Sequence, residues 1–193
     1  MNFMKMNHVG RLEVICGSMF SGKSEELIRR LRRAEFARFS IQVFKHQLDE
    51  RLTADHVHAH SGGKISAVPV ASSAQMAAMV VQETQIIGID EIQFFDLDIV
   101  SLITTLIDEK KRVIVAGLDL DFRMVPFGCM PALMAIADEV IKLKAVCLVC
   151  GDDARFTQRL VNGKPACVRD PLIVIGAQEC YQARCRSCYQ LIP

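Results

Sequence analysis

The chain has 193 residues, of which 51% are hydrophobic and 23% charged, and its formal net charge is +1. This length allows one full domain with a small appendage, and the composition excludes a disordered chain. The near-neutral charge argues against a protein that coats a polyanion, because nucleic-acid binders usually carry a basic excess or a basic face.

The chain has no feature that indicates export or membrane insertion. Its first residues lack an uninterrupted apolar segment followed by a small-residue cleavage site. The longest charge-free stretch, residues 65–82, is interrupted by proline, serine and glutamine, so it is too polar to span a bilayer. Eight cysteines without a signal favour a reducing compartment. We therefore expect a soluble, cytoplasmic protein without a membrane partner.

Apolar runs alternate with helical patterns over the first three-quarters of the chain. Strands are expected at residues 12–16, 41–44, 86–90, 112–118 and 140–146. Helices are expected at residues 24–39, 74–82, 96–111 and 131–139. Because apolar strands that alternate with helices are typical of a sheet covered on both faces, the pattern predicts an α/β fold with a mostly parallel sheet.

Two further features belong to this overall organisation. The first predicted helix carries one dense basic cluster, formed by Arg29, Arg30, Arg32 and Arg33, whose members we expect to point mostly to solvent. After Val146 the long helical patterns give way to turn residues, short β-like runs and four cysteines. We therefore expect an α/β domain at residues 1–146 and a small cysteine-bearing subdomain at residues 147–193.

The segment after the first predicted strand fits the pattern G-x-x-x-x-G-K-[ST]. Glycines let backbone N–H groups turn around an anion, and the N-terminus of the next helix adds a favourable potential. In such a loop Lys23 can reach the β- and γ-phosphates and Ser24 can ligate Mg²⁺. An ordinary glycine turn is the alternative, but the strand–loop–helix context favours phosphate binding. The predicted phosphate loop consists of Gly17, Ser18, Met19, Phe20, Ser21, Gly22, Lys23 and Ser24.

A phosphate loop usually works with an acidic residue at the end of a second strand, and the run IIGIDE supplies one. Asp90 is placed to hold Mg²⁺, directly or through water, and Glu91 to accept a proton from an attacking hydroxyl or water. The alternative is that the two acids only end a strand and cap the next turn. Because this acidic pair accompanies the glycine loop, we expect ATP with Mg²⁺ as the ligand.

Four cysteines form two C-x-x-C pairs, Cys147 with Cys150 and Cys185 with Cys188, separated by 34 residues. Two such pairs can close a tetrahedral shell of thiolates around Zn²⁺, which leaves no open position and makes the metal structural. Redox pairs are the competing interpretation, but a metal cage requires two pairs together. Core or incidental thiols are expected at Cys16, Cys129, Cys167 and Cys180.

The segments GSMFSGKS, DEIQFF and GLDLDFRMVPFG, followed by the cysteine pairs, make the chain similar to thymidine kinases of the cytosolic, zinc-containing type. The resemblance extends from about residue 12 to residue 188. It implies a RecA-like P-loop domain with a zinc-ribbon-like subdomain. It also implies transfer of the γ-phosphate of ATP to the 5′-hydroxyl of thymidine, and of deoxyuridine, in pyrimidine deoxynucleotide salvage. The family further suggests a homotetramer.

The same resemblance implies roles for residues around the phosphates. Glu91 would be the general base, and Lys23 with the loop N–H groups would neutralise charge on the transferring group. Ile92 and Gln93, which follow the acidic pair, would belong to the ATP-binding residues. Asp49 and Arg51 match a family segment near the phosphates, although a surface ion pair is the alternative for these two.

Aromatic and apolar residues match the family's pocket for the base. Without the resemblance, Phe94 and Leu118 would be interpreted as core residues. Residues 172–181 would form a lasso over the base, and zinc would hold both ends of the loop that contains it. The pocket residues implied by the resemblance are Met19, Phe94, Leu118, Phe122, Phe127, Val174 and Tyr181.

Two other classes of protein share some of these features. A P-loop ATPase that handles nucleic acid would need a basic ribbon, but acidic residues dilute the basic ones after residue 150. A nucleotide-sensing module would keep Lys23 and Ser24 without needing a base at Glu91. His56, His58 and His60 have the spacing of metal ligands, yet we expect solvated histidines on this polar segment.

Overall fold

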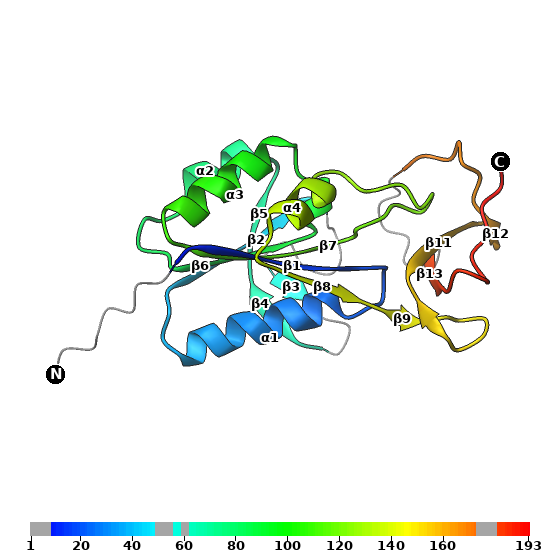
Figure 1. The fold of residues 1–193 in the computed structure, drawn as a ribbon, viewed down its shortest axis with the longest axis horizontal. Coiled ribbons are helices and arrows are strands. Elements are labelled where there is room, and N and C mark those ends of the chain that lie inside the picture. The colour runs from blue at the N-terminus through cyan, green and yellow to red at the C-terminus, as the bar shows by residue number, and fades with distance from the viewer. Residues whose placement is uncertain (1–8, 49–55, 59–61, 173–180) are drawn as a thin grey trace.

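The computed structural model describes residues 9–48, 56–58, 62–172 and 181–193. Its centre is a 6-stranded sheet in the order β5-β2-β6-β7-β1-β8, in which all neighbouring strands are parallel (Figure 1). The strands are β1 (Arg11–Gly17), β2 (Ile41–His46), β5 (Val68–Val70), β6 (Ile86–Asp90), β7 (Arg112–Gly117) and β8 (Glu139–Leu143). The predicted parallel sheet is thus confirmed.

Helices cover both faces of this sheet. One face packs against α1 (Lys23–Phe36), and the other against α2 (Ser73–Met79), α3 (Asp98–Asp108) and α4 (Met130–Ile136) (Figure 1). Each face has its own apolar cluster: Leu27 and Leu31 belong to the cluster under α1, whereas Ile99, Ile103 and Leu133 belong to the other. The helical spacing of these residues explains why each helix buries a single stripe.

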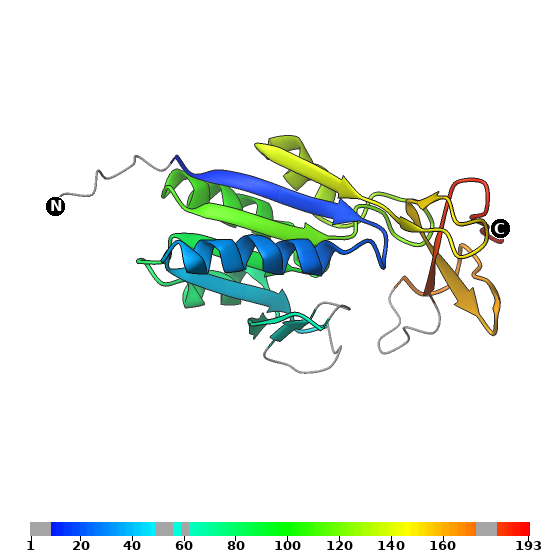
Figure 2. The same cartoon turned by 90° about the horizontal axis from the view of Figure 1, so that it is seen from below.

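A short hairpin, β3 (His56–His58) and β4 (Lys64–Ser66), lies on the same side of the sheet as α1 (Figure 2). Val57 and Ile65 face each other across it and join the apolar cluster under α1. His56 and His58 lie on β3, with their ring centroids 5.9 Å apart. His60, the third histidine of the predicted group, lies outside the described residues.

The chain leaves the parallel sheet at Leu143 and enters small antiparallel sheets. β9 (Ala145–Val146) pairs with β10 (Asp153–Ala154), and β11 (Phe156–Val161) pairs with β12 (Lys164–Pro165) and β13 (Tyr181–Arg184). This C-terminal subdomain lies beyond the carboxyl ends of the parallel strands (Figure 1). The division into two domains at residue 146 stays a prediction.

The predicted strand at residues 140–146 is two strands with different partners. β8 runs beside β1 only as far as the pair Gly17 and Leu143, the last in the register. Beyond that point β1 has become the glycine loop, so the chain has no strand neighbour in the parallel sheet. Ala145 and Val146 pair with β10 instead. The apolar pattern predicts extended backbone correctly, but it carries no information about where the pairing partner ends.

The basic cluster of α1 differs partly from the expectation. Arg30 is buried, with 8% of its surface exposed, and its guanidinium contacts the carboxylates of Glu13, Glu26 and Glu139. Arg29, Arg32 and Arg33 are exposed, as predicted. Among the described residues, no helix has the length and the apolar character needed to cross a membrane.

Candidate active site

The glycine loop connects β1 directly to α1. Gly17 has a φ of 142°, and a Cβ at this position would lie 2.4 Å from the carbonyl oxygen of Leu143, so no larger residue fits. Gly22 caps α1 in the left-handed region, with a φ of 86°. Lys23, the first residue of the helix, is 9% exposed, and its Nζ donates to the carbonyl oxygen of Ser18 at 2.8 Å. The loop therefore folds tightly at the carboxyl end of β1.

The loop and the predicted acidic strand end are in direct contact. Ser24 Oγ donates to Asp90 Oδ2 at 3.0 Å, and Asp90, the last residue of β6, is 3% exposed. A hydroxyl and a carboxylate at this distance are oxygen ligands of the kind that Mg²⁺ takes beside nucleotide phosphates. These two residues fit the predicted magnesium site.

Glu91 follows at the start of a tight turn. It is 6% exposed and adopts a left-handed backbone with a φ of 51°, which is uncommon for a residue with a side chain. Its Oε2 accepts a hydrogen bond from Gln93 Nε2 at 2.5 Å. Non-glycine residues in this conformation occur often at functional sites, where the surrounding structure holds them.

Gln93 connects this turn to the next strand. It lies in η1 (Ile92–Phe94), is 2% exposed, and its Oε1 accepts from the backbone N–H of Leu118 at 3.0 Å. One amide group thus orients the Glu91 carboxylate and holds the end of β7. Ile92 is fully buried in the core, so its side chain is not exposed for the expected ATP contact, which stays a prediction.

The predicted pocket residues form two groups. Phe94 and Phe127 meet edge to face, with ring centroids 5.7 Å apart, and the N–H of Leu118 donates to Gln93, the residue before Phe94. Phe122 is 4% exposed, and the guanidinium of Arg159 lies 5.3 Å from its ring centroid. Tyr181 pairs with Arg159 across β11 and β13, which associates it with the second group.

Three predicted residues, Asp49, Arg51 and Val174, lie outside the described residues. Phe20 and Ser21 lie in the turn of the loop: Phe20 is 40% exposed, and Ser21 Oγ donates to the carbonyl oxygen of Ser18 at 2.8 Å.

Two residues near the site are not predictable from local sequence patterns. Thr157 in β11 accepts the N–H of Met19 through its Oγ1 at 3.0 Å. His46, at the end of β2, packs edge to face on Phe95, with ring centroids 5.0 Å apart, and lies 6.1 Å from Phe94. Burial lowers the pKa of His46 below its usual value, although the carbonyl of Ala71 and the charge of Asp96 oppose the shift.

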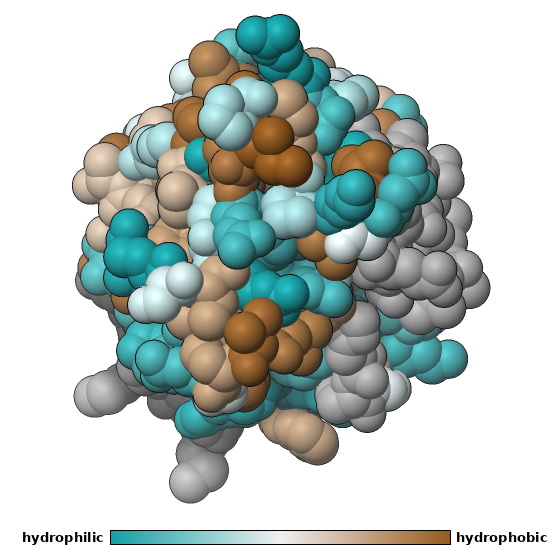
Figure 3. Space-filling view, turned by 90° about the vertical axis from the view of Figure 1, so that its right-hand side faces the viewer, coloured by the Kyte–Doolittle hydropathy of each residue, from teal (hydrophilic) through white to brown (hydrophobic). Residues whose placement is uncertain are grey.

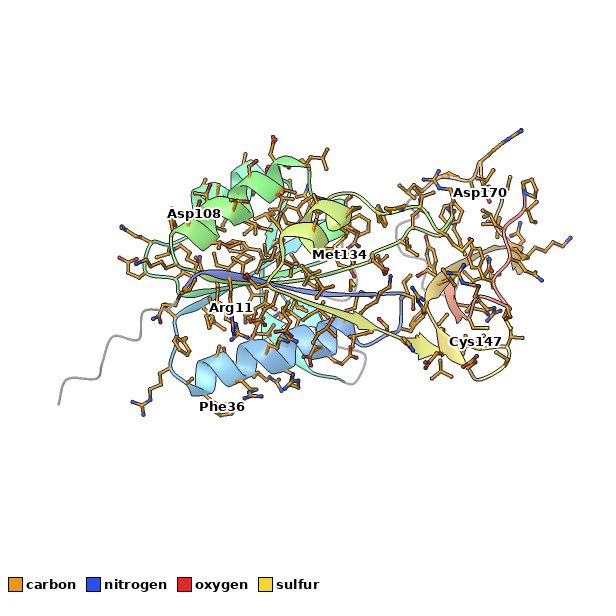
Figure 4. All side chains as sticks on the ribbon, viewed as in Figure 1. Arg11, Phe36, Asp108, Met134, Cys147 and Asp170 are labelled. Atoms are coloured by element: carbon orange, nitrogen blue, oxygen red, sulfur yellow. The ribbon has the colours of Figure 1, made fainter. Side chains whose placement is uncertain are left out.

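The four cysteines of the two pairs converge at the far end of the molecule. The sulfur atoms of Cys147, Cys150, Cys185 and Cys188 lie within 4.8 Å of one another, as a shared metal ion requires. Cys147 is labelled in Figure 4. Burial opposes ionisation of Cys147, but backbone N–H groups of Cys185, Cys150 and Val149 outweigh it and lower its pKa to about 6. Four cysteine sulfur atoms this close together fit a structural zinc site.

The surface around the cysteine cluster is chemically mixed. Hydrophobic patches alternate with hydrophilic residues on the end of the molecule that carries the C-terminal subdomain (Figure 3). Val146, Leu148 and Val149, next to the cysteine pair, are exposed. By contrast, Cys16 and Cys129 are fully buried core thiols, as predicted, and burial raises their pKa values to about 11 and about 12.

A parallel sheet whose glycine loop contacts an acidic strand end through a serine and an aspartate defines a P-loop ATP-binding protein of the α/β class. The family model described as thymidine kinase matches residues 10–189. The chain therefore belongs to the thymidine kinase family and is an enzyme that phosphorylates thymidine with ATP, which confirms the resemblance carried by its sequence motifs.

The solved structures include a distant likeness. The flagellar accessory protein FlaH from Methanocaldococcus jannaschii superposes with a TM-score of 0.52, at 16% identity, over 75% of this chain and 75% of the other. At this identity the likeness concerns the fold alone.

Proposed function

We propose that this enzyme transfers the γ-phosphate of ATP to the 5′-hydroxyl of thymidine, with Glu91 as the general base. The observation that carries the proposal is the position of Glu91. It is buried, oriented by Gln93, and directly follows Asp90, which is bonded to Ser24 of the phosphate loop. A carboxylate in this place can accept the hydroxyl proton while the loop holds the phosphates.

The phosphate loop would supply most of the electrostatic stabilisation. Lys23 would move from the Ser18 carbonyl to the β- and γ-phosphates, and backbone N–H groups of the loop other than that of Met19 would surround them. Ser24 and Asp90 would hold Mg²⁺, which neutralises charge on the phosphate oxygens when it is bound. Arg51 would add positive charge near the phosphates, as the resemblance of the segment that contains Asp49 and Arg51 implies.

The nucleoside would lie between the two aromatic groups. Phe94, Phe127 and Leu118 would contact one part of the base, and Met19, Phe122 and Tyr181 another. The segment that contains Val174 would close over it. We propose that zinc on the four cysteines is structural and anchors both ends of this segment, because four thiolates complete the coordination shell.

The finer functional statements rest on family membership. We propose that deoxyuridine is a second substrate, since it differs from thymidine by a single methyl group, and a hydrophobic group of this size discriminates only about 10- to 200-fold. We also propose a cytoplasmic homotetramer that works in deoxynucleotide salvage.

The test is a nucleoside kinase assay in which the protein is incubated with ATP, Mg²⁺ and each nucleoside, and 5′-monophosphates are separated by chromatography. Glu91→Gln should lower kcat by about 100-fold or more, the usual contribution of a general base, while thymidine binding is retained. Asp108→Asn, an exposed acid at the end of α3, is the matched control.

Normal turnover of Glu91→Gln would show that Glu91 is not the base. If no monophosphate forms and polynucleotides stimulate ATP hydrolysis, the nucleoside kinase proposal itself is wrong.

A further inference from the structure

The peptide unit between Ser18 and Met19 is held on both of its polar sides. Its carbonyl oxygen accepts Lys23 Nζ and Ser21 Oγ, each at 2.8 Å. Its N–H, from Met19, donates to Thr157 Oγ1 at 3.0 Å. Because the peptide is planar and its N–H and C=O point in opposite directions, an acceptor that holds the N–H also sets the direction of the carbonyl.

The acceptor comes from the C-terminal subdomain, 138 positions away in the sequence. Thr157 is 5% exposed and pairs with Ala183 across β11 and β13. Ala183 belongs to the small core of the cysteine cluster, and its carbonyl accepts the N–H of Leu148 at 3.1 Å. A short chain of contacts therefore leads from the cysteine cluster to the phosphate loop, through the main chain of β11 and β13 and then the Thr157 hydroxyl.

A second contact joins the same two parts of the molecule. Ser18 is 3% exposed, and its Oγ faces the carbonyl oxygen of Ala154 at 3.5 Å. Ala154 lies in β10, which pairs with β9 next to Cys147. Ser18 and Met19, the two residues of this peptide unit, thus each contact the cysteine-bearing subdomain.

We infer that Thr157 is a positioning residue of the phosphate loop. By fixing the Ser18–Met19 peptide, it sets the resting place of the Lys23 ammonium and the direction of one loop N–H. The cysteine-bearing subdomain then acts on the ATP side of the reaction and not only on the nucleoside. This inference rests on the proposed function of residues 17–24 as the ATP-phosphate loop.

The physical consequence follows from the loss of the acceptor. Without the Thr157 hydroxyl, the Met19 N–H would lose its partner at a half-buried position, and the peptide would be held only at its carbonyl side, by Lys23 and Ser21. A change in the orientation of this peptide would move the Ser18 carbonyl away from Lys23, so the lysine would no longer be held beside the loop when ATP binds. A neutral hydrogen bond of ordinary strength corresponds to about a fivefold change in an equilibrium constant.

The test compares Thr157→Val, which keeps the shape and removes the acceptor, with Thr157→Ser, which keeps the hydroxyl. We expect Thr157→Val to weaken the binding of ATP alone, measured by calorimetry without nucleoside, by about fivefold. The KM for thymidine should change less, and Thr157→Ser should restore ATP binding. Zinc content and thermal midpoint show that each variant is folded, and Thr157→Ala replaces the valine variant if that one is not.

Thr105→Val, on the exposed side of α3, is the matched control for the loss of a threonine hydroxyl. A change confined to the thymidine KM would overturn the inference, because Thr157 would then act on the nucleoside and not on the loop. Unchanged kinetics and binding would overturn it as well.

Lys23→Ala separates this inference from the proposed function. If that variant binds ATP normally, the phosphate loop assignment is wrong. If it loses ATP affinity while Thr157→Val does not, only the role of Thr157 is wrong.

Discussion

Glu91 and Gln93 show how a single side chain can be oriented by its second neighbour in the chain. The left-handed backbone of Glu91 turns the chain back, so that Gln93 Nε2 reaches its carboxylate at 2.5 Å. The other end of the same amide holds the Leu118 N–H. A carboxylate fixed in this way loses little freedom when a substrate binds, which favours catalysis by positioning.

His46 is a second residue whose environment determines its properties. Its Nδ1 accepts the N–H of Leu48 at 3.2 Å, and its Nε2 lies 3.2 Å from the carbonyl oxygen of Ala71. The neutral ring with hydrogen on Nε2 satisfies both contacts, whereas the charged ring would direct a second N–H at the Leu48 N–H. Protonation of His46 therefore opposes the folded structure.

This arrangement predicts how stability depends on pH near His46. Its pKa in the folded protein lies below 6.5, so the unfolded chain binds the proton first as pH falls. The stability that His46 contributes is fully present above about pH 6.5 and is lost as pH falls below that value. The urea midpoint of unfolding, measured with zinc in excess, should fall between pH 7.5 and pH 5.5. This fall should be larger for the parent protein than for His46→Asn. Equal differences would contradict the prediction.

At the scale of elements, one buried carboxylate connects the sheet to its first helix. Glu13 of β1 is 1% exposed and contacts Arg112 of β7 at 2.6 Å, as well as Arg11 at 2.8 Å and Arg30 of α1. Arginine hydrogen bonds outweigh burial and lower the pKa of Glu13. This cluster lies on β1 at the end opposite the glycine loop, where Arg11 is labelled in Figure 4.

Glu13→Gln should therefore destabilise the fold without changing the site. The substitution removes the carboxylate that Arg112 contacts and one of the three that Arg30 contacts, and breaking a buried ion pair costs about 3–5 kcal/mol. Urea unfolding measures this loss, and KM values for both substrates should stay unchanged. Glu139→Gln is the control, since Glu139 contacts the same Arg30 but is 47% exposed and should cost less than about 1 kcal/mol. Similar losses in both variants would refute the prediction.

At the scale of the whole molecule, the parallel sheet and the cysteine-bearing subdomain meet at the glycine loop. All six strands direct their carboxyl ends toward this subdomain (Figure 2). The loop contacts it through Met19 and Ser18. A substitution that disrupts the cluster of four cysteines should therefore also affect the active site, although Cys147 is not part of the glycine loop.

Cys147→Ser tests this connection. We expect the variant to lose zinc, to unfold at a lower temperature, and to bind thymidine more weakly, because the ends of the closing segment are no longer held. Elemental analysis gives the metal content, and nucleoside titration gives the affinity. Cys167→Ser, whose sulfur donates to the carbonyl of Pro193, should keep its zinc. An unchanged zinc content in Cys147→Ser would rule out the cage.

Local sequence patterns are sufficient to predict much of this protein. Leu27, Leu31 and Ile103 are buried as their helical spacing predicts, and the expected strands of the parallel sheet are present. These features are predictable because periodicity and turn chemistry act over a few residues. The glycine loop, the acidic pair and the cysteine spacing are also local patterns, so the sequence alone is enough to recognise them.

Other features depend on residues that are far apart in the chain. Thr157 is an ordinary strand residue until β11 is placed beside Met19, and Arg30 appears solvated until Glu13 of the adjacent strand is placed beside it. Likewise, residues 140–146 form two strands because β1 ends at Gly17. Local sequence determined which elements form and which chemistry each segment carries. Only the tertiary structure decided which side chains meet, because such contacts depend on strand order and register and not on spacing along the chain.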